Sequence, residues 1–245
     1  MDDLIIISNL NDFIFCPASI YFHKLYGNEE RLMFGRKIEQ NKIINQTEVL
    51  KQIRNKSEYL KEGINLLENL SSTLESETDY LTIMGIEGNA AKIYFPRMFE
   101  NVKWNGRKPR IKNDYINVTL DIGYTMLFNI VDAILQVYGF DTYYGVFHKC
   151  FYMRKSFVCD IMEPMRPIID YSVRKAINLG QCKEEHFEEY NRRWCLKYKN
   201  NPAYIQFLMT SILEFKNDIF MYIQKYYRYI MKMKSVEDIP VFKIR

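Results

Sequence analysis

Apolar residues recur every three or four positions along most of this chain, which is the spacing of helices that bury one face. Between residues 38 and 74, Leu60, Ile64 and Leu67 fall on one such stripe, and Gly63 is a possible break. Prolines and glycines then mark the ends of further predicted helices. These helices span 80–95, stopped by Pro96; 117–138, ended by Gly139; 163–179, ended by Gly180; and 202–234. The body of the chain is therefore predicted to be all-α.

The first 35 residues follow a different pattern. The run "LIIIS" is typical of a strand, and "NDFIFCPASIYFHKLYG" (11–27) predicts a short aromatic-rich helix that ends at Gly27. We therefore expect two parts: a short, atypical N-terminal segment, 1–37, and an α-helical domain, 38–245.

Composition and charge narrow the class of protein. A content of 48% hydrophobic and 15% aromatic residues over 245 residues is typical of a folded globular chain. The net charge is −4 over residues 1–80 and +8 over residues 81–245, which gives +4 overall. A basic body suits a polyanionic partner, although charge alone does not identify one.

The cysteines and apolar runs bear on the cellular setting. Five cysteines, at 16, 150, 159, 182 and 195, are an odd number without a pair at zinc-finger spacing, so free thiols are expected. No secretory signal is visible, and the apolar run "MLFNIVDAILQVYGF" is interrupted by Asp132. We expect a soluble, cytoplasmic protein with no membrane partner.

The stretch "LTIMGIEGNAAKIYF" (81–95) places Glu87 between Gly85 and Gly88. Each glycine inside a helix costs about 1 kcal/mol relative to alanine, so close approach of another helix or of a ligand is expected to offset them. Helical spacing puts Glu87 on the face of Ile83 and Tyr94, pointing inward. A buried carboxylate needs a cation. Glu87 is therefore either ion-paired with a basic residue at a helix–helix seam or part of a metal or catalytic site.

A second candidate stretch is "GVFHKCFYMRKSFVCDIMEP" (145–164). Pro164 and the following Pro167 suit the first turn of a helix, which would place Asp160 and Glu163 at its positive end. His148 lies on a preceding segment that can fold back beside them. The alternatives are a histidine satisfied in the core or at the surface and two acids that only cap the helix.

Together, these side chains would make a mixed imidazole and carboxylate site. Oxygen ligands favour Mg²⁺ and an imidazole shifts the preference toward Mn²⁺. The sequence holds no HExxH, CxxC or glycine-rich phosphate loop, which disfavours zinc proteases and nucleotide triphosphatases. A nucleophilic triad is poorly supported, because His23 lies in the N-terminal segment and His186 in "CKEEHFEEY", which is typical of a solvated helix face.

Residues 97–112 form a basic loop around Phe99 and Trp104. Such a run either solvates a loop or contacts phosphates, and its place just after Glu87 favours phosphate contact. Its basic residues are Arg97, Lys103, Arg107, Lys108, Arg110 and Lys112.

From about Ile38 onward the chain resembles the CRISPR-associated spacer-acquisition integrase, the universal endonuclease/integrase subunit of CRISPR adaptation. The resemblance covers roughly 200 residues, in the family's order. One departure is Asp121, where many relatives have asparagine. The matching stretches are "KIINQTEVL", "GIEGNAAKIYF", "GRKPRIKNDYIN", "TLDIGYTMLFNIVDAILQVYGFDTYYGVFH", "FVCDIMEPMRPIIDYSV" and "AINLG".

The resemblance implies a helical catalytic domain whose metal ligands fall on Glu87, His148 and Glu163, with Asp160 as an accompanying catalytic acid. It implies Mg²⁺ or Mn²⁺ and attack of a DNA 3′-hydroxyl on phosphodiesters at the leader–repeat junction. The implied partners are spacer-precursor and CRISPR DNA, further copies of the chain as a homodimer or higher oligomer, and a small ferredoxin-like adaptation subunit. The rival functions are a non-catalytic DNA-binding scaffold and a stand-alone nuclease on branched DNA.

The residues expected to contact DNA come from the basic loop and from positions around the expected metal site. They are Lys92, Arg97, Lys103, Arg107, Lys108, Arg110, Lys112, Tyr124, Lys149 and Arg166.

At the front, the family usually carries a longer β-rich domain. Here "LIIISNLNDFIFCPASIYFHKLYGNEE" resembles instead the start of the CRISPR-associated iron–sulfur exonuclease. That enzyme needs a cysteine triplet near its C-terminus and its own nuclease acids, which this sequence lacks, so Cys16 is expected to hold no iron–sulfur cluster. The segment is interpreted as a remnant of a fusion or a minimal replacement of the β-rich domain.

Overall fold

The computed structural model describes residues 28–108, 111–148, 153–232 and 238–245. The strand and helix expected before Gly27, together with Cys16, lie outside these residues. The described elements follow one another as α3 (Asn28–Lys51), α4 (Glu58–Thr73), α5 (Tyr80–Met98), α6 (Tyr115–Val137), α7 (Ser156–Met162), the 3-10 helix η2 (Glu163–Met165), α8 (Arg166–Asn178), η3 (Glu184–His186), β1 (Phe187–Tyr190), β2 (Arg193–Leu196), η4 (Tyr198–Asn200), α9 (Asn201–Glu214) and α10 (Lys216–Met231).

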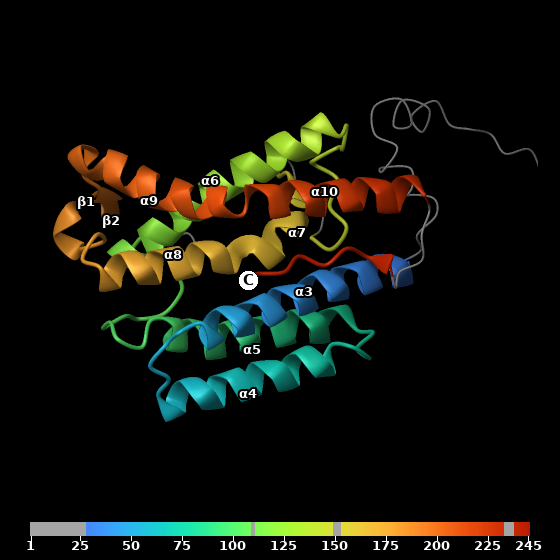
Figure 1. Cartoon of the computed structure of the whole chain (residues 1–245), viewed down its shortest axis with the longest axis horizontal. Coiled ribbons are helices and arrows are strands. Elements are labelled where there is room, and N and C mark those ends of the chain that lie inside the picture. Colours follow the sequence, from blue (N-terminus) through green and yellow to red (C-terminus); the bar gives the residue numbers. More distant parts are fainter. Residues whose placement is uncertain (1–27, 109–110, 149–152, 233–237) are drawn as a thin grey trace, which may run out of the picture.

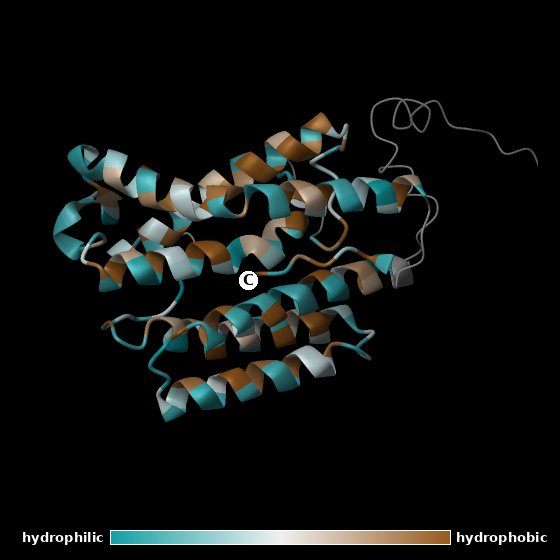
Figure 2. Cartoon of the chain, in the orientation of Figure 1, coloured by the Kyte–Doolittle hydropathy of each residue, from teal (hydrophilic) through white to brown (hydrophobic). Residues whose placement is uncertain are grey.

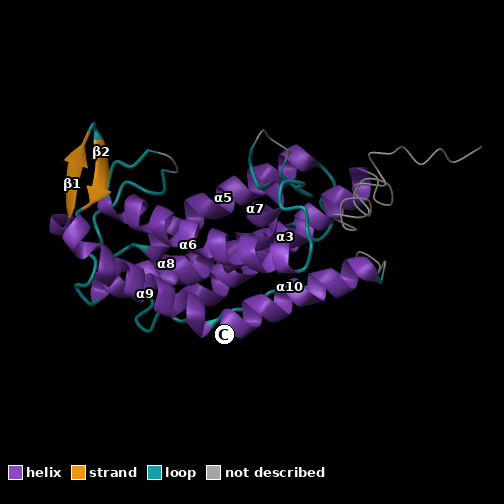
Figure 3. Cartoon of the chain, turned by 90° about the horizontal axis from the view of Figure 1, so that it is seen from above, coloured by secondary structure: helices purple, strands orange, loops and turns teal. Residues whose placement is uncertain are grey.

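The helices form two packed layers, and the prediction of a mainly-α fold is confirmed (Figures 1 and 3). α3, α4 and α5 pack on one another in one layer, while α6 packs on α7, α8 and α9 in the other. α3 also contacts η2, α7 and α8, so it lies at the boundary between the layers. α3 begins at Asn28, so the expected boundary at 37/38 falls inside this helix; the division of the chain into two parts stays a prediction.

The predicted break at Gly63 is wrong. α3 ends at Lys51 and α4 begins at Glu58, after Ser57, whose side chain caps α4 by accepting a hydrogen bond from Leu60 N. Gly63 lies inside α4 because the Arg97 side chain crosses it: a Cβ at Gly63 would lie 1.8 Å from Cδ of Arg97. The glycine therefore permits close packing of α4 on α5.

Two other boundaries and one element type differ from the sequence prediction. α5 continues through Pro96 to Met98. Pro96 lies in the last turn, where it disturbs only the end of the helix. The helix predicted over 202–234 is interrupted at Phe215, between α9 and α10. β1 and β2 form an antiparallel hairpin where a solvated helix face was expected, and His186 lies in η3, with its Nδ1 3.1 Å from the Tyr204 hydroxyl.

α6 matches the helix predicted over 117–138 and is rich in apolar residues (Figure 2). By length and composition alone it could cross a membrane, but half of that apolar window is buried inside the protein. Leu120, Leu127 and Val131 of α6 are fully buried in the main core. α6 therefore has the position of a central core helix.

A buried carboxylate joins α5, α6 and α8. Asp170 accepts hydrogen bonds from the hydroxyl of Tyr94, at 3.1 Å, and from that of Tyr124. Burial raises the pKa of Asp170 to about 6, although both hydroxyl donors act in the opposite direction. The three side chains tie the two layers together close to the predicted site.

The segment 238–245 is clasped by α3, between the layers (Figure 1). Asn41 donates to Phe242 O and accepts from Phe242 N, both at 2.8 Å. Asn45 donates to Phe242 O at 3.0 Å and to Pro164 O at 2.8 Å, and accepts from Ile244 N at 3.2 Å. Two asparagines one helical turn apart therefore replace the partner strand that this extended segment lacks, and Asn45 also fixes the backbone next to Glu163.

We predict that Asp170→Asn flattens the dependence of stability on pH. The folded pKa of about 6 exceeds the usual value of 3.8, so the native state of the wild type binds the proton more tightly, and its stability falls as pH rises from about 4 to 6. The difference corresponds to on the order of 3 kcal/mol. Urea denaturation of both proteins at pH 4 to 7 measures it. Parallel curves for the two proteins would show that Asp170 does not titrate in this range.

We predict that Asn41→Ala lowers the free energy of unfolding by about 2–4 kcal/mol, because it leaves a buried N–H and a buried carbonyl of Phe242 with fewer partners. Hydrogen exchange at Phe242 and Ile244 should quicken more than exchange elsewhere. Asn65→Ala, at an exposed position of α4, is the matched control and should change stability by less than about 0.5 kcal/mol. Equal effects of the two substitutions would contradict the role of the clasp.

Candidate functional site

Three carboxylates converge where α3, α5 and η2 meet. Glu39 comes from the middle of α3, Glu87 from the middle of α5 and Glu163 from the first residue of η2. One oxygen atom of each lies within 4.8 Å of the others. We call this group the carboxylate cluster. It contains both glutamates that were predicted as metal ligands, Glu87 and Glu163.

The ammonium group of Lys42 lies inside the carboxylate cluster. Its Nζ is 2.7 Å from Glu87 Oε1, 2.7 Å from Glu163 Oε2 and 3.3 Å from Glu39 Oε2. Glu39 and Glu163 are buried, while Glu87 stands at the rim and is partly exposed. Glu87 is therefore ion-paired at a helix–helix contact, as one interpretation of the sequence expected. It also belongs to a group of acids of the kind that the other interpretation, a metal or catalytic site, requires.

The protonation of the cluster follows from burial and mutual charge. Burial would raise the pKa of Glu163, but the positive charges of Arg166 and Lys42 outweigh it and hold that pKa below its usual value. For Glu39, burial is the largest effect, and with the charges of Glu87 and Glu163 it raises the pKa in spite of Lys42. The pKa of Lys42 stays well above its ordinary value despite burial, because of the three acids around it. Lys42 and Glu163 are therefore charged at neutral pH, and Glu39 takes up a proton more easily than Glu163.

His148 and Asp160 form a second unit beside the cluster. The backbone N–H groups of Val146, Phe147 and His148 donate to the Asp160 carboxylate at 2.6, 3.1 and 3.0 Å. His148 Nδ1 lies 2.5 Å from Asp160 Oδ1. Burial lowers the pKa of the imidazole, but the hydrogen bond to Asp160 and the charges of Asp160 and Glu163 outweigh it and leave that pKa raised.

The contact between His148 Nδ1 and Asp160 sets the roles of the two ring nitrogens of His148. An Nδ1–H that donates to Asp160 leaves the lone pair on Nε2, which is the form in which histidine binds metals. His148 is not one of the three residues whose ligand atoms lie within 4.8 Å of one another, yet Glu163 and Glu39 act on its pKa through their charges. Asp160 lies in α7 and binds the preceding loop, so it does not cap α8 as the alternative interpretation held.

Arg166 extends the charged site toward α6. Its Nε is 2.9 Å from Glu163 Oε1, and its guanidinium carbon lies 4.9 Å from the centre of the Tyr124 ring. The guanidinium of Arg107 lies 5.3 Å from the centre of the same ring and also pairs with Asp121 at 2.6 Å. Asp121 thus holds the basic loop on α6.

The residues predicted to contact DNA fall into three groups. Lys92, Lys103, Lys108 and Lys112 are exposed. Arg97 is buried and donates to Tyr59 O and Ile93 O, while Tyr124, Arg107 and Arg166 are engaged as described above. Arg110 and Lys149 lie outside the described residues.

The glycines beside Glu87 do not permit a helix–helix contact, so that part of the expectation is wrong. A Cβ added at Gly85 or Gly88 would meet no atom within 4 Å. Both positions are exposed, as is the neighbouring Asn89. The face of α5 next to Glu87 is therefore bare backbone, open to a ligand.

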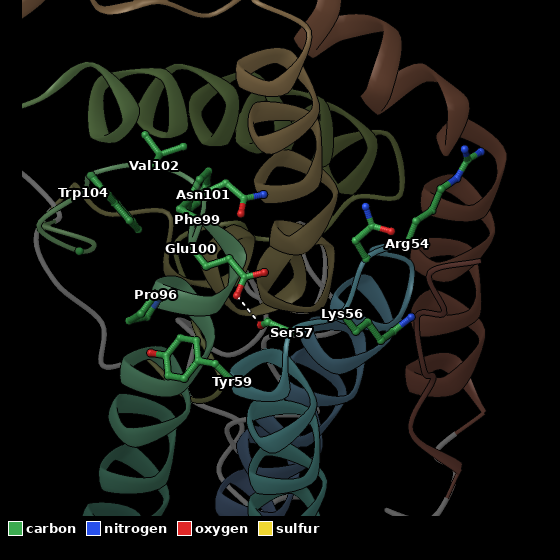
Figure 4. Close-up of a pocket in the computed structure, with 12 residues that line it drawn as sticks. Arg54, Lys56, Ser57, Tyr59, Pro96, Phe99, Glu100, Asn101, Val102 and Trp104 are labelled. Carbon is green, nitrogen blue, oxygen red and sulfur yellow. Dashed lines mark hydrogen bonds between the residues drawn. The ribbon is translucent and has the colours of Figure 1, made fainter.

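A cavity of about 1030 Å³ lies away from the carboxylates, where α3 and α5 end and α4 begins (Figure 4). Arg54, Lys56, Tyr59 and Trp104 line it, and Glu100 accepts a hydrogen bond from Ser57 at its wall at 2.7 Å. The end of α3 is about 14 Å along the helix axis from Lys42. Trp104 belongs to the basic loop, so the cavity adjoins that loop. It is separate from the carboxylate cluster.

Sequence reasoning missed Glu39 and Lys42. They stand three positions apart in "GRKIEQNKIINQ", where Ile38 and Ile43 are fully buried. Two opposite charges next to buried isoleucines were the available signal. It was weak because polar residues surround them on every face of α3.

The donor set fits a divalent cation. Carboxylate oxygens are the ligands that Mg²⁺ and Mn²⁺ prefer, and an imidazole with its second nitrogen held by a carboxylate is a common companion. The cluster already attracts a positive charge, because it holds an ammonium group at 2.7 Å from two of its members. Glu87, Glu163 and His148 are the residues that could hold such an ion, and Glu39 is a third carboxylate beside them.

Solved structures share this fold. The chain aligns with a "Cas6-RT-Cas1--Cas2 complex" chain at a TM-score of 0.85 and 21% identity, over 96% of this chain and 27% of that one. It aligns with a "Casposase bound to integration product" at a TM-score of 0.74 and 19% identity, over 89% and 66% of the two chains. At these identities the likeness establishes the helical fold.

Curated relatives are more similar in sequence. A CRISPR-associated endonuclease Cas1 of Thermodesulfovibrio yellowstonii is 27% identical over 84% of this chain and 68% of its own length. One from Leptospira interrogans is 32% identical over 65% of this chain and 68% of its own length. The chain thus spans about two thirds of the length of both relatives.

The family model described as CRISPR associated protein Cas1 matches residues 19–208. The match takes in α3 with Lys42, α5 with Glu87 and the segment from His148 to Glu163, which together build the site. The chain belongs to the Cas1 family.

Proposed function

We propose that this protein is a divalent-metal-dependent DNA endonuclease and integrase, which joins a DNA 3′-hydroxyl to phosphodiesters at the leader–repeat junction of a CRISPR array. One observation carries the proposal. Glu39, Glu87 and Glu163 converge on the buried ammonium group of Lys42, beside the His148–Asp160 pair. Two curated relatives bear the name endonuclease, and a casposase bound to an integration product shares the fold.

Glu87 and Glu163, through anionic oxygens, and His148, through a neutral nitrogen, are the residues that would hold Mg²⁺ or Mn²⁺. When bound, such an ion polarises the scissile phosphate and offsets the negative charge that develops during transesterification. Asp160 holds the ring of His148 through Nδ1, and three backbone N–H groups hold Asp160 in turn. The imidazole is thereby oriented before DNA arrives, which lowers the entropic cost of assembling the site.

DNA approaches the open face of α5. Gly85 and Gly88 leave the backbone bare beside Glu87, and Lys92 is exposed one turn further along the helix. Lys103, Lys108 and Lys112 extend this positive surface along the basic loop. Arg110 and Lys149 stay predicted phosphate contacts. Arg97, Tyr124, Arg107 and Arg166 act mainly by positioning the loop and Glu163, since their polar groups already have protein partners.

The working assembly contains more than one chain. We propose a homodimer or higher homo-oligomer that binds spacer-precursor and CRISPR DNA, with the small ferredoxin-like adaptation subunit as a partner. The fold is shared with chains solved in complexes named Cas1–Cas2, which supports such an assembly.

We predict that Glu87→Ala or His148→Ala reduces strand transfer by at least about 100-fold, because either substitution removes a group that stabilises charge in the transition state. The assay combines a labelled duplex with a free 3′-hydroxyl, a supercoiled CRISPR plasmid and Mn²⁺. DNA binding should stay within about two-fold of the wild type. Glu68→Ala is the matched control, since Glu68 is an exposed acid that pairs with Lys51.

The products of the same assay separate the proposal from its rivals. Joined products support an integrase, nicks alone indicate a nuclease, and a shifted but unaltered substrate indicates a scaffold. Undiminished joining by the Glu87→Ala protein would contradict the assignment of the site.

We predict that replacing Lys103, Lys108 and Lys112 by alanine weakens DNA binding without preference for sequence. Each lysine that contacts a phosphate contributes about 0.9 to the slope of log K against log salt concentration, so the slope should fall by that amount for each residue. Fluorescence anisotropy with labelled duplex from low to high salt measures the slope. Lys61→Ala, on the exposed face of α4 and paired with Glu58, should leave it unchanged. A slope that the triple variant shares with the wild type would exclude the loop as a DNA contact.

A further inference from the structure

Lys42 is unusual among the described lysines because its ammonium group is buried and has three carboxylate partners. The side chain is 10% exposed, and its partners come from α3, α5 and η2. Burying a lysine ammonium group has an unfavourable desolvation free energy unless opposite charges lie close to it in a favourable geometry. The chain meets this cost by placing the ammonium group among the acids that form the candidate metal site.

Lys51 offers a comparison within the same helix. It pairs with Glu48, three residues earlier in α3, and with Glu68 from α4, both at 2.9 Å. Lys42 likewise pairs with Glu39, three residues earlier, and with acids from other elements. The two lysines differ in burial, since Lys51 is 42% exposed and Lys42 is 10% exposed. An exposed ion pair such as that of Lys51 contributes little to the stability of the protein. Pairing along the helix therefore does not explain why Lys42 is buried, whereas the acids of the candidate metal site do.

A divalent ion and the ammonium group cannot both occupy their preferred places. An ion bound to both Glu87 and Glu163 must contact carboxylate oxygens close to the ammonium group. One oxygen of each glutamate lies 2.7 Å from Lys42 Nζ, and the ligand oxygens of the two glutamates lie within 4.8 Å of each other. Two cations at such separations in a buried site repel each other strongly. Binding of the ion therefore requires that Lys42 give up Glu87 and Glu163.

We propose that Lys42 is a built-in counter-cation of the metal site, which holds Glu87 and Glu163 together before a divalent ion binds and which that ion displaces. The inference rests on the proposed function, because it concerns the same site. Lys42 lowers the affinity for the ion, and in exchange keeps two acids from separating while the site is without metal.

Glu39 gives the displaced lysine a partner. It lies three positions before Lys42 on the same helix, with its Oε2 3.3 Å from Lys42 Nζ, so helix geometry keeps the two side chains adjacent when Glu87 and Glu163 bind an ion. This explains why a third acid is buried at a site whose predicted ligands include only two. Lys42 and Glu39 are thus positioning residues that act through the metal ligands.

The test compares the binding of Mn²⁺ to the wild type, to Lys42→Met and to the matched Lys51→Met. Isothermal titration calorimetry with Mn²⁺ alone, without DNA, measures the dissociation constant. We expect Lys42→Met to bind Mn²⁺ at least ten-fold more tightly than the wild type, and Lys51→Met to bind within two-fold of it. Without metal, Lys42→Met should also have a lower melting temperature than the wild type, and Mn²⁺ should raise it by more.

A second measurement uses the wild type and so does not depend on whether the variant folds. In ¹⁵N NMR spectra of the lysine ammonium groups, Mg²⁺ should shift the signal of Lys42 and leave that of Lys51 in place. Weaker or unchanged Mn²⁺ binding by folded Lys42→Met, or a Lys42 signal that saturating Mg²⁺ does not move, would overturn the proposal.

The same data separate this inference from the proposed function. Glu87→Gln should weaken Mn²⁺ binding if Glu87 is a ligand. If the wild type binds no Mn²⁺ that depends on Glu87, the proposed metal site itself fails. If Glu87→Gln weakens binding but Lys42→Met does not tighten it, the metal site stands and only the role of Lys42 is rejected.

Discussion

The compensation of charge around Lys42 is the interaction on which the site depends. Glu87 and Glu163 lie on elements that are far apart in sequence, and α3 carries the positive charge that joins them. Buried acids without a cation would separate, take up protons or draw in water. The two helical layers therefore meet at a point that requires a cation, and this requirement is what makes the point suitable for a metal.

Hydrogen bonds between side chains and the surrounding backbone hold this point in place. Asp160 holds the segment that carries His148, and Asn45 holds both Pro164 and the segment 238–245. The candidate metal ligands His148 and Glu163 are thus held in place by the side chains of Asp160 and Asn45. Such support is what fixes ligands to within a fraction of an ångström, which a catalytic site needs.

The helices could be predicted from the sequence because their apolar periodicity is strong, as in α6. Their ends were less predictable, because caps and packing decide them: Ser57 starts α4, and Arg97 makes use of Gly63 inside it. Glu87 and Glu163 were predicted from their sequence contexts to belong to one mixed imidazole and carboxylate site, and the family resemblance implied that both are metal ligands. Lys42 was not, because a lysine among polar residues on α3 has the pattern of a solvated position, and only its three partners from distant segments show that it is buried.

A crystal structure grown with Mn²⁺, with anomalous diffraction recorded at the manganese absorption edge, tests the central claim most directly. The account predicts one anomalous peak in contact with Glu87, Glu163 and His148 Nε2, with the ammonium group of Lys42 withdrawn from the first two. A structure in which Lys42 keeps both glutamates at saturating Mn²⁺, with no peak among these residues, would contradict it.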